Sequence, residues 1–481
     1  MSDELENQQA LFGSRVRMNS IEAFHLHSSS DSWPNCITSR HHFRGSIDID
    51  LAKQAWLHCL SRQKRAAWQI NLRGWPNWKV VDDQKQVEQR AESSFHEVIV
   101  DQWPDCETKF ELPNVNDRGL PQVGVLDGSG FGMWCIRSAS NDRFTLMVSG
   151  DHAFADGTGA LTTVRDWMTT YHNLIHDQPI NRGLVKLDWE RWKKRSELGL
   201  FKWSFLKFLP CQAIGLFGAT KFVLRRFSTI DAQNESRQTY RSPGIIGQSV
   251  DPEMVAELND RAERLSVSTN SLLMTILFRT MNRIGNIVDD DNSPNSKWSD
   301  RKWIRLVLPI SIRSISDRKL PCANRASLVQ VERTAEQVAD ADAAAQSIDR
   351  EVRIIMGFKL DYVFLIAIRM LSIVPALLKW VSRNQKSRGT VVFTNLGDPF
   401  RKTRTCNFRD VGNLKLVDYD FCGPIRHGTP INFAWSTSRP TINSESETHA
   451  RVTLHFDRKV VSHVAAHSIL QTFMKELQDV V

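Results

Sequence analysis

The chain has 481 residues, of which 41% are hydrophobic and 24% charged, and its formal net charge is +8. This composition excludes a disordered or fibrous protein and is sufficient for a large core, shared by two lobes or divided between two domains. The positive charge favours anionic partners such as coenzyme A, an acidic carrier protein, nucleic acid or anionic lipid, although a basic soluble enzyme without such a partner fits it equally well.

Residues 1–180 are predicted to form an amino-terminal lobe. Ile37 to Gly45 has the pattern of a strand, and Ile49 to Arg62 that of an amphipathic helix. Apolar and polar residues then alternate from Phe144 to Ser149, as in a half-buried strand, and apolar residues recur at helical spacing from Leu161 to Ile175. The turn between this strand and this helix is therefore predicted to expose its side chains while both elements hold it in place.

Residues 181–227 mix tryptophan and phenylalanine with lysine and arginine, a combination typical of a segment at a membrane interface. Residues 241–481 are predicted to form a second lobe. Its most apolar stretch, Tyr362 to Trp380, is interrupted by Arg369 and Pro375. We therefore predict core helices there rather than a transmembrane span, which leaves only peripheral membrane contact open.

The turn from Ser149 to Ala160 contains a histidine, a carboxylate and a cluster of glycines. His152 is the candidate general base, because a neutral imidazole can accept a proton near physiological pH. A lone histidine is more often a structural residue, so this assignment depends on Asp156, on Gly157 and on motifs further along the chain. No serine or cysteine nucleophile motif accompanies them, and we expect no covalent intermediate.

The sequence gives little indication of a metal or a tightly bound cofactor. The eight cysteines are scattered without Cys-x-x-Cys spacing, which argues against a zinc ribbon or a disulfide framework and favours a cytoplasmic location. His463 and His467 have the spacing of two zinc ligands on one helix face, but no third ligand is evident. No phosphate-binding loop or dinucleotide fingerprint is present in the sequence.

Three motifs together resemble those of the acyltransferases with the chloramphenicol acetyltransferase-like fold. This superfamily includes alcohol acyltransferases, wax ester synthases and the condensation domains of peptide synthetases. The first motif is His-x-x-x-Asp-Gly, from His152 to Gly157; the second is the strand and turn from Val307 to Arg313; the third is the strand from Val391 to Gly397, which ends in Asn-Leu-Gly. Their order and separations also fit, although Asp151 stands where many members carry another histidine.

The resemblance implies an α/β fold of two similar lobes, each a mainly antiparallel or mixed sheet with helices, and an active site in the tunnel between them. It makes residues 181–240 an interlobe crossover, which we favour over a membrane segment. It also implies that His152 is the base and that Asp156 is structural, with Arg313 as its partner. The Gly157 amide, Thr394 and Asn395 are the candidate oxyanion donors.

The function implied by the resemblance is acyl transfer. We expect transfer from acyl-coenzyme A, as a co-substrate, to the hydroxyl of an alcohol. One alternative is a free-standing condensation enzyme that takes its acyl group from a carrier-protein thioester and makes an amide or an ester. A second is a non-catalytic protein that binds an acylated ligand. Nucleic acid is not an expected partner.

Overall fold

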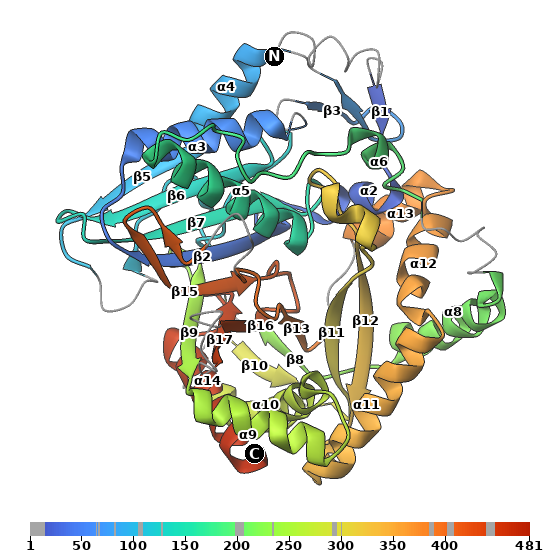
Figure 1. Ribbon diagram of the computed structural model, residues 1–481. Coiled ribbons are helices and arrows are strands. Elements are labelled where there is room, and N and C mark those ends of the chain that lie inside the picture. The colour runs from blue at the N-terminus through green and yellow to red at the C-terminus, as the bar shows by residue number, and fades with distance from the viewer. Residues whose placement is uncertain are drawn as a thin grey trace.

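Two six-stranded sheets dominate the computed structural model, one in each lobe (Figure 1). The structure describes residues 15–63, 65, 68–80, 83–103, 109–126, 128–197, 206–232, 235–290, 296–299, 301–383, 389–401, 408–438 and 448–481. Both sheets are mixed, since most neighbouring strands are antiparallel but β5 and β6, β11 and β13, and β13 and β16 are parallel. The expected two-lobed α/β fold is confirmed.

The first sheet has the order β14-β15-β2-β7-β6-β5. Its strands are β2 (Cys36–Arg44), β5 (Phe95–Val100), β6 (Phe131–Ser138), β7 (Arg143–Asp151), β14 (Asp410–Val411) and β15 (Leu414–Cys422). The helices of this lobe gather on one side of the sheet in Figure 1: α3 (Ile49–Arg62), α4 (Gln84–Ser93) and α5 (Gly157–Ile175). The short helix α2 (Ser20–Ser28) and a small sheet of β1 (Arg15–Arg17), β4 (Asn77–Lys79) and β3 (Gln69–Asn71) complete it.

The second sheet has the order β12-β11-β13-β16-β17-β9. Its strands are β9 (Gly244–Val250), β11 (Ile304–Ser311), β12 (Ala326–Arg333), β13 (Val391–Asn395), β16 (Ile431–Ser438) and β17 (His449–Phe456). Its helices are α9 (Pro252–Arg264), α10 (Thr269–Asp290), α11 (Ala341–Gly357) and α14 (His463–Val480), and β8 (Thr229–Ala232) pairs with β10 (Ser296–Ser299). Four further helices lie along one side of the molecule in Figure 1: α6 (Trp189–Lys193), α8 (Leu209–Leu224), α12 (Val363–Leu371) and α13 (Pro375–Arg383). The chain also has the short 3-10 turns η3 (Ile315–Lys319) and η5 (Leu360–Tyr362).

Strand β15 joins the two lobes. It comes from the part of the chain that builds the second sheet, but it pairs antiparallel with β2 of the first sheet. Its buried Asp420 binds Arg40 of β2 at 2.6 Å and Arg451 of β17 at 2.6 Å. Burial alone would raise the pKa of Asp420, but the two arginines hold it well below its usual range. One carboxylate thus links the two sheets.

The crossover contributes buried aromatic and basic side chains that pack between elements. The ring of Trp192 in α6 is fully buried, with the guanidinium of Arg195 3.6 Å from its centroid and that of Arg65 at 4.7 Å. Arg195 also forms an ion pair with the buried Glu22 of α2 at 2.6 Å. Trp192 and Arg195 therefore serve internal packing, whereas Ile214, Phe217 and Leu224 of α8, in the same crossover, are exposed. Residues 198–205 lie outside the described ranges.

One sequence prediction about the second lobe is only partly right. Residues 362–380 form helices, and Leu365, Ile368 and Leu378 pack into a buried cluster with α2. Much of their other apolar surface faces outward, since Ile373 is 80% exposed and Trp380 is 61% exposed. Across the described ranges, no helix is both long enough and apolar enough to span a membrane.

Candidate active site

The turn that carries His152 is held by main-chain hydrogen bonds at the end of β7. The amide of His152 donates to the carbonyl of Asn35 at 2.8 Å, which ties the turn to the segment before β2. Asp156 then caps α5, because its carboxylate accepts a hydrogen bond of 2.8 Å from the amide of Gly159. The strand, turn and helix predicted from the sequence are all present, but the strand is buried on both faces from Phe144 to Asp151 and not half-buried.

The carboxylate of Asp156 is buried and faces Arg313. The Nη2 atom of Arg313 lies 2.8 Å from Oδ1 and its Nε lies 3.3 Å from Oδ2. The amide of Arg325 donates to Oδ2 at 2.8 Å. Burial alone would raise the pKa of Asp156, but Arg313 and these amides lower it, so the carboxylate stays ionised.

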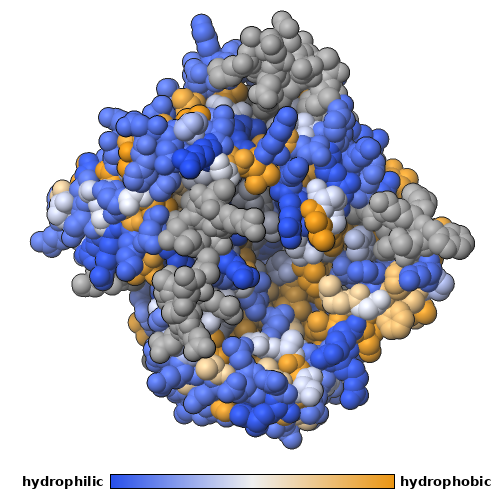
Figure 2. Space-filling model, viewed as in Figure 1, coloured by the Kyte–Doolittle hydropathy of each residue, from blue (hydrophilic) through white to orange (hydrophobic). Residues whose placement is uncertain are grey.

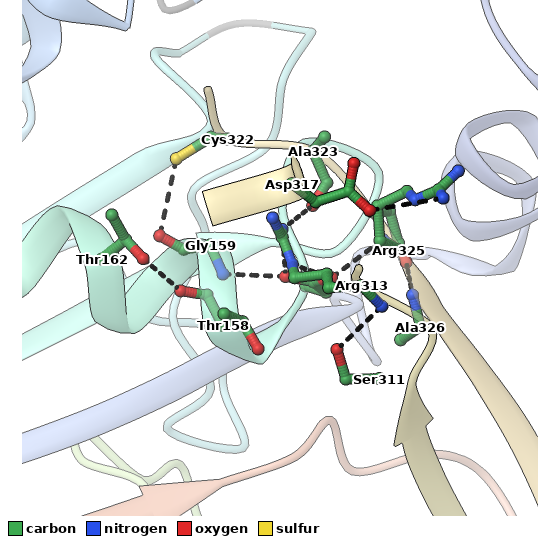
Figure 3. Close-up of polar contacts among 12 residues, drawn as sticks. Thr158, Gly159, Thr162, Ser311, Arg313, Asp317, Cys322, Ala323, Arg325 and Ala326 are labelled. Carbon is green, nitrogen blue, oxygen red and sulfur yellow. Dashed lines mark hydrogen bonds and ion pairs between the residues drawn. The ribbon is translucent and has the colours of Figure 1, made fainter. Parts of the chain in front are cut away.

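Figure 3 shows how Arg313 and Arg325 lie against the start of α5. Arg313 also donates to the carbonyl of Ala323 at 2.8 Å. Arg325 lies 3.5 Å from Asp317, a residue of η3. The ion pair of Asp156 thus fastens the ends of β11 and β12 to the amino terminus of α5, and it brings the second lobe to the turn that carries His152.

Asn324 of the second lobe binds His152 at two atoms. Its amide nitrogen Nδ2 lies 2.8 Å from the ring Nδ1 and 2.8 Å from the main-chain carbonyl of His152. The carbonyl Oδ1 of Asn324 accepts from the amide of Ala326 at 3.3 Å, which fixes the orientation of the side-chain amide. A donor at Nδ1 leaves the neutral imidazole with its proton on Nε2.

A second histidine stacks on His152. The ring of His25, from α2, is parallel to that of His152 within 5°, and their centroids are 3.9 Å apart. The Nδ1 atom of His25 lies 2.9 Å from Nδ2 of Asn35. The pair is therefore held from both sides by asparagine side chains, Asn35 and Asn324.

Both histidines line a cavity of about 190 Å³ between the lobes. Its wall is mainly apolar, and the first residues of α5 reach it. The lining includes Ile37, Gly157, Thr158, Val307, Pro309, Ile310, Leu328, Val392, Thr394, Asn395, Leu396, Phe421 and Arg426. A mainly apolar cavity beside a histidine and a helix amino terminus suits an uncharged acyl chain and a reaction that develops negative charge on oxygen.

Gly157 is required by a close approach of Phe421. A Cβ atom at position 157 would lie 2.9 Å from Cζ of the Phe421 ring, closer than side-chain carbons normally pack. The ring belongs to β15, so this glycine is where the strand that crosses between lobes meets the turn that carries His152. The absence of a side chain also leaves the first amide of α5 at the cavity wall.

Thr394 and Asn395 reach the same cavity from the end of β13. The side-chain amide of Asn395 already makes two hydrogen bonds. Its Oδ1 accepts from the main-chain amide of Gly397 at 3.0 Å, and its Nδ2 lies 3.4 Å from Oδ1 of Asn270. The structure therefore brings His152, Gly157, Thr394 and Asn395 to one space and places Arg313 behind Asp156.

Sequence reasoning missed His25, Asn35, Asn324 and Arg426. Each belongs to a segment far from the histidine motif, and none stands in a recognisable pattern in the sequence. Only for Asn324 does the sequence offer an indirect indication, because this residue follows the motif that ends at Arg313 by eleven positions.

Within the part of the chain that the structure describes, no three His, Cys, Asp or Glu side chains are grouped so as to hold a metal ion. His463 and His467 are neighbours on α14, with ring centroids 4.5 Å apart. They belong to the far side of the second lobe and take no part in the cavity.

The fold recurs among solved structures at very low sequence identity. The first condensation domain of the CDA synthetase superposes with a TM-score of 0.64 at 11% identity, over 97% of this chain and 96% of that chain. The chain has the fold of a condensation domain. The condensation domain of Monacolin K polyketide synthase (TM-score 0.59, 12% identity, 97% of both chains) has the same fold. So does the starter condensation domain of rhizomide synthetase, in a variant bound to C8-CoA (TM-score 0.59, 10% identity, 99% of this chain and 96% of that chain).

No protein-family model matches the sequence, and a search of curated proteins finds no match.

Proposed function

We propose that the protein is an acyltransferase that moves an acyl group from a thioester to a hydroxyl or amine, with His152 as the residue that transfers the proton. The observation that carries this proposal is the position of His152 in an apolar cavity, beside the amino terminus of α5 and between two lobes. As the acceptor attacks, its proton goes to Nε2 of His152, for which the ring takes the tautomer with its own proton on Nδ1, and the tetrahedral oxyanion is stabilised by donors at the wall. When the C–S bond breaks, the proton passes to the thiolate.

Acyl-coenzyme A and an alcohol are the substrates that we favour, with no covalent acyl-enzyme. The thiol of Cys322 is near the turn, but burial raises its pKa to about 11, which makes it a poor nucleophile. The oxyanion donors are the amides at the start of α5 and the side chains of Thr394 and Asn395. Acyl-coenzyme A is a co-substrate here and not a bound cofactor.

A carrier-protein thioester is the second candidate donor. It is supported by the shared fold, since the similar structures include condensation domains of peptide and polyketide synthetases. The basic net charge of the chain suits both donors, because coenzyme A and carrier proteins are both anionic.

The test is release of free thiol from acyl-coenzyme A or from acyl-carrier protein in the presence of alcohols and amines. Wild-type protein should release thiol at least a hundredfold faster than His152→Ala. Turnover of the carrier-bound acyl group alone would replace the coenzyme A assignment with the second candidate. Thiol release by His152→Ala at the wild-type rate with both donors would reject acyl transfer through this residue.

A further inference from the structure

Arg426 brings a positive charge into the cavity that His152 lines. It follows β15, and its side chain is half-buried. Its Nη2 atom donates to Oδ1 of Asn35 at 2.7 Å, and loss of hydration lowers its pKa to about 10, so it remains charged at neutral pH. In the described ranges, no carboxylate lies within ion-pair distance of Arg426.

The buried arginines of the described ranges each pair with a carboxylate. Four of these pairs are Arg40–Asp420, Arg118–Asp457, Arg195–Glu22 and Arg305–Glu332. A guanidinium withdrawn from water without an opposite charge destabilises the fold. Among the described residues, Arg426 therefore has no counter-charge, at a place where a ligand could supply one.

Arg426 is connected to the two stacked histidines through the side chain of Asn35. Asn35 accepts its hydrogen bond through Oδ1 and contacts Nδ1 of His25 through Nδ2, and His25 stacks on His152. An anionic group bound by Arg426 would thus lie one side chain away from the histidine pair. The rest of the wall is mainly apolar, which suits a molecule with one anionic end and an apolar body.

We propose that Arg426 binds the carboxylate of the acyl acceptor, so that the acceptor is an apolar hydroxy acid or amino acid. This inference rests on the proposed function and names its substrate class. The acceptor O–H or N–H bond breaks as the new C–O or C–N bond forms, the C–S bond of the thioester breaks, and the proton reaches the thiolate through His152. The carboxylate stays unchanged and holds the acceptor in place.

The experiment measures binding and needs no turnover. Isothermal titration compares octanoate with octanamide, which has the same length and no charge. Wild-type protein should bind octanoate at least tenfold more tightly, and Arg426→Gln should bind both equally. Glutamine can still donate to Asn35, so the histidine pair keeps its support, while Arg426→Lys should keep part of the preference. Arg261→Gln, which removes a surface pair with Asp342, is the matched control and should behave as wild type.

Two results would overturn the carboxylate assignment. One is equal binding of octanoate and octanamide by wild-type protein, or an unchanged preference in Arg426→Gln. The other is a loss of coenzyme A affinity in Arg426→Gln with octanoate binding intact, which would make the anion a phosphate of the donor. Because acyl transfer is assayed separately, a failed acyl-transfer assay and a failed carboxylate assignment are distinguishable.

A second, independent observation is the apolar surface formed by α8, α12 and α13. Hydrophobic residues reach the surface over α8 and α12 on the right of Figure 2. The most exposed are Ile214 (72%), Phe217 (80%) and Leu224 (80%) in α8 and Met370 (57%), Ile373 (80%), Val374 (52%) and Trp380 (61%) in or beside α12 and α13. We call this set the apolar ridge. A monomer seldom leaves so many large apolar side chains together in water.

The helices of the ridge pack against one another, and the charged residues within them are basic. Gly215 of α8 lies so close to the start of α12 that a Cβ there would meet Val363 at 2.7 Å. The sequences of α8, α12 and α13 contain no Asp or Glu, whereas Arg369, Lys379 and Arg383 are exposed. Apolar helix faces that carry only basic charges match an anionic lipid surface.

We infer that the apolar ridge binds the surface of an anionic membrane. The probe is co-sedimentation with vesicles of phosphatidylcholine, with and without phosphatidylglycerol. Wild-type protein should bind the anionic vesicles at least tenfold better, and added salt should weaken this binding. Phe217→Glu and Ile373→Glu should each reduce binding at least tenfold.

Val464→Glu is the matched control, because Val464 is 67% exposed on α14, away from the ridge, and its variant should bind as wild type. Equal sedimentation of all variants, or none with either vesicle, would overturn the inference. Light scattering that finds a dimer in wild type and a monomer in Ile373→Glu, without vesicle binding, would assign the ridge to a second copy of the chain and would also overturn it.

Discussion

Asn324 holds His152 from the opposite lobe, with one amide nitrogen 2.8 Å from both the ring Nδ1 and the main-chain carbonyl. This contact favours the tautomer with the proton on Nε2, whereas a base that acts through Nε2 must have that atom bare. The contact therefore sets how readily His152 accepts a proton, and it depends on the two lobes staying together.

Asn324→Asp should change the pH dependence of acyl transfer. A carboxylate accepts from Nδ1–H, so it favours the tautomer with a bare Nε2 and also stabilises the imidazolium. The acidic limb of the rate profile should move up by about one pH unit or more. The measurement is kcat against pH for wild type, Asn324→Asp and Asn324→Ala; an acidic limb that does not move would show that Asn324 has no influence on the protonation of His152.

Removal of the Asp156 carboxylate should destabilise the fold as well as reduce activity. Asp156→Ala removes the buried member of the pair and leaves the half-buried Arg313 without its partner, and loss of one member of such a pair costs about 3–5 kcal/mol. His152→Ala should leave stability almost unchanged while activity is lost. Urea unfolding of the two variants separates the roles; equal stability of Asp156→Ala and wild type would contradict a structural role for the pair.

The same pair should make stability depend on pH in the acid range. The pKa of Asp156 is lower in the folded state than in the unfolded chain, where it is about 3.8. The ionised carboxylate therefore contributes its full stabilisation above pH 3.8, and this stabilisation is lost as the pH falls through the pKa of the folded state. Melts of wild type between pH 5 and pH 2 should therefore fall more steeply than those of Asp156→Asn.

Gly157→Ala should impair activity through Phe421. The added methyl group lies 2.9 Å from the ring, so the strand or the turn must shift, at a cost of about 1–3 kcal/mol. Phe421→Leu removes the ring edge and should restore part of the lost activity when combined with Gly157→Ala. The check is kcat/KM for the two single variants and the double variant; a double variant no better than Gly157→Ala would disprove this contact as the cause.

Asp151→Asn should stabilise the protein at neutral and alkaline pH. Asp151 is buried, and burial raises its pKa to about 7. The folded state therefore holds a proton that the unfolded chain releases near pH 4, and wild-type stability falls as the pH rises from about 4 to about 7. Asparagine keeps the acceptor for the amide of Ala153 and removes this loss, a gain of about 2–4 kcal/mol at pH 8. Thermal melts of wild type and Asp151→Asn at pH 5 and pH 8 test this prediction. An equal increase in stability over wild type at both pH values would refute it.

The sequence alone determined the local architecture of the site. Alternation along 144–149 and helical spacing after 160 fix a strand, a turn and a helix, because side-chain periodicity follows directly from backbone geometry. The resemblance to the acyltransferases implied the roles of His152, Asp156 and Gly157, and it implied Arg313 as the partner that the structure shows 2.8 Å from Asp156.

The tertiary structure decided everything that depends on distant segments meeting. Asn324 is 172 residues from His152 along the chain, and Arg426 is 391 residues from Asn35. Strand β15 lies in the first sheet because its apolar side chains, such as Tyr419 and Phe421, complete the core of that lobe. The periodicity of the sequence cannot predict such pairings. The free energy that selects them comes from burial and hydrogen bonds between segments that are not neighbours in sequence.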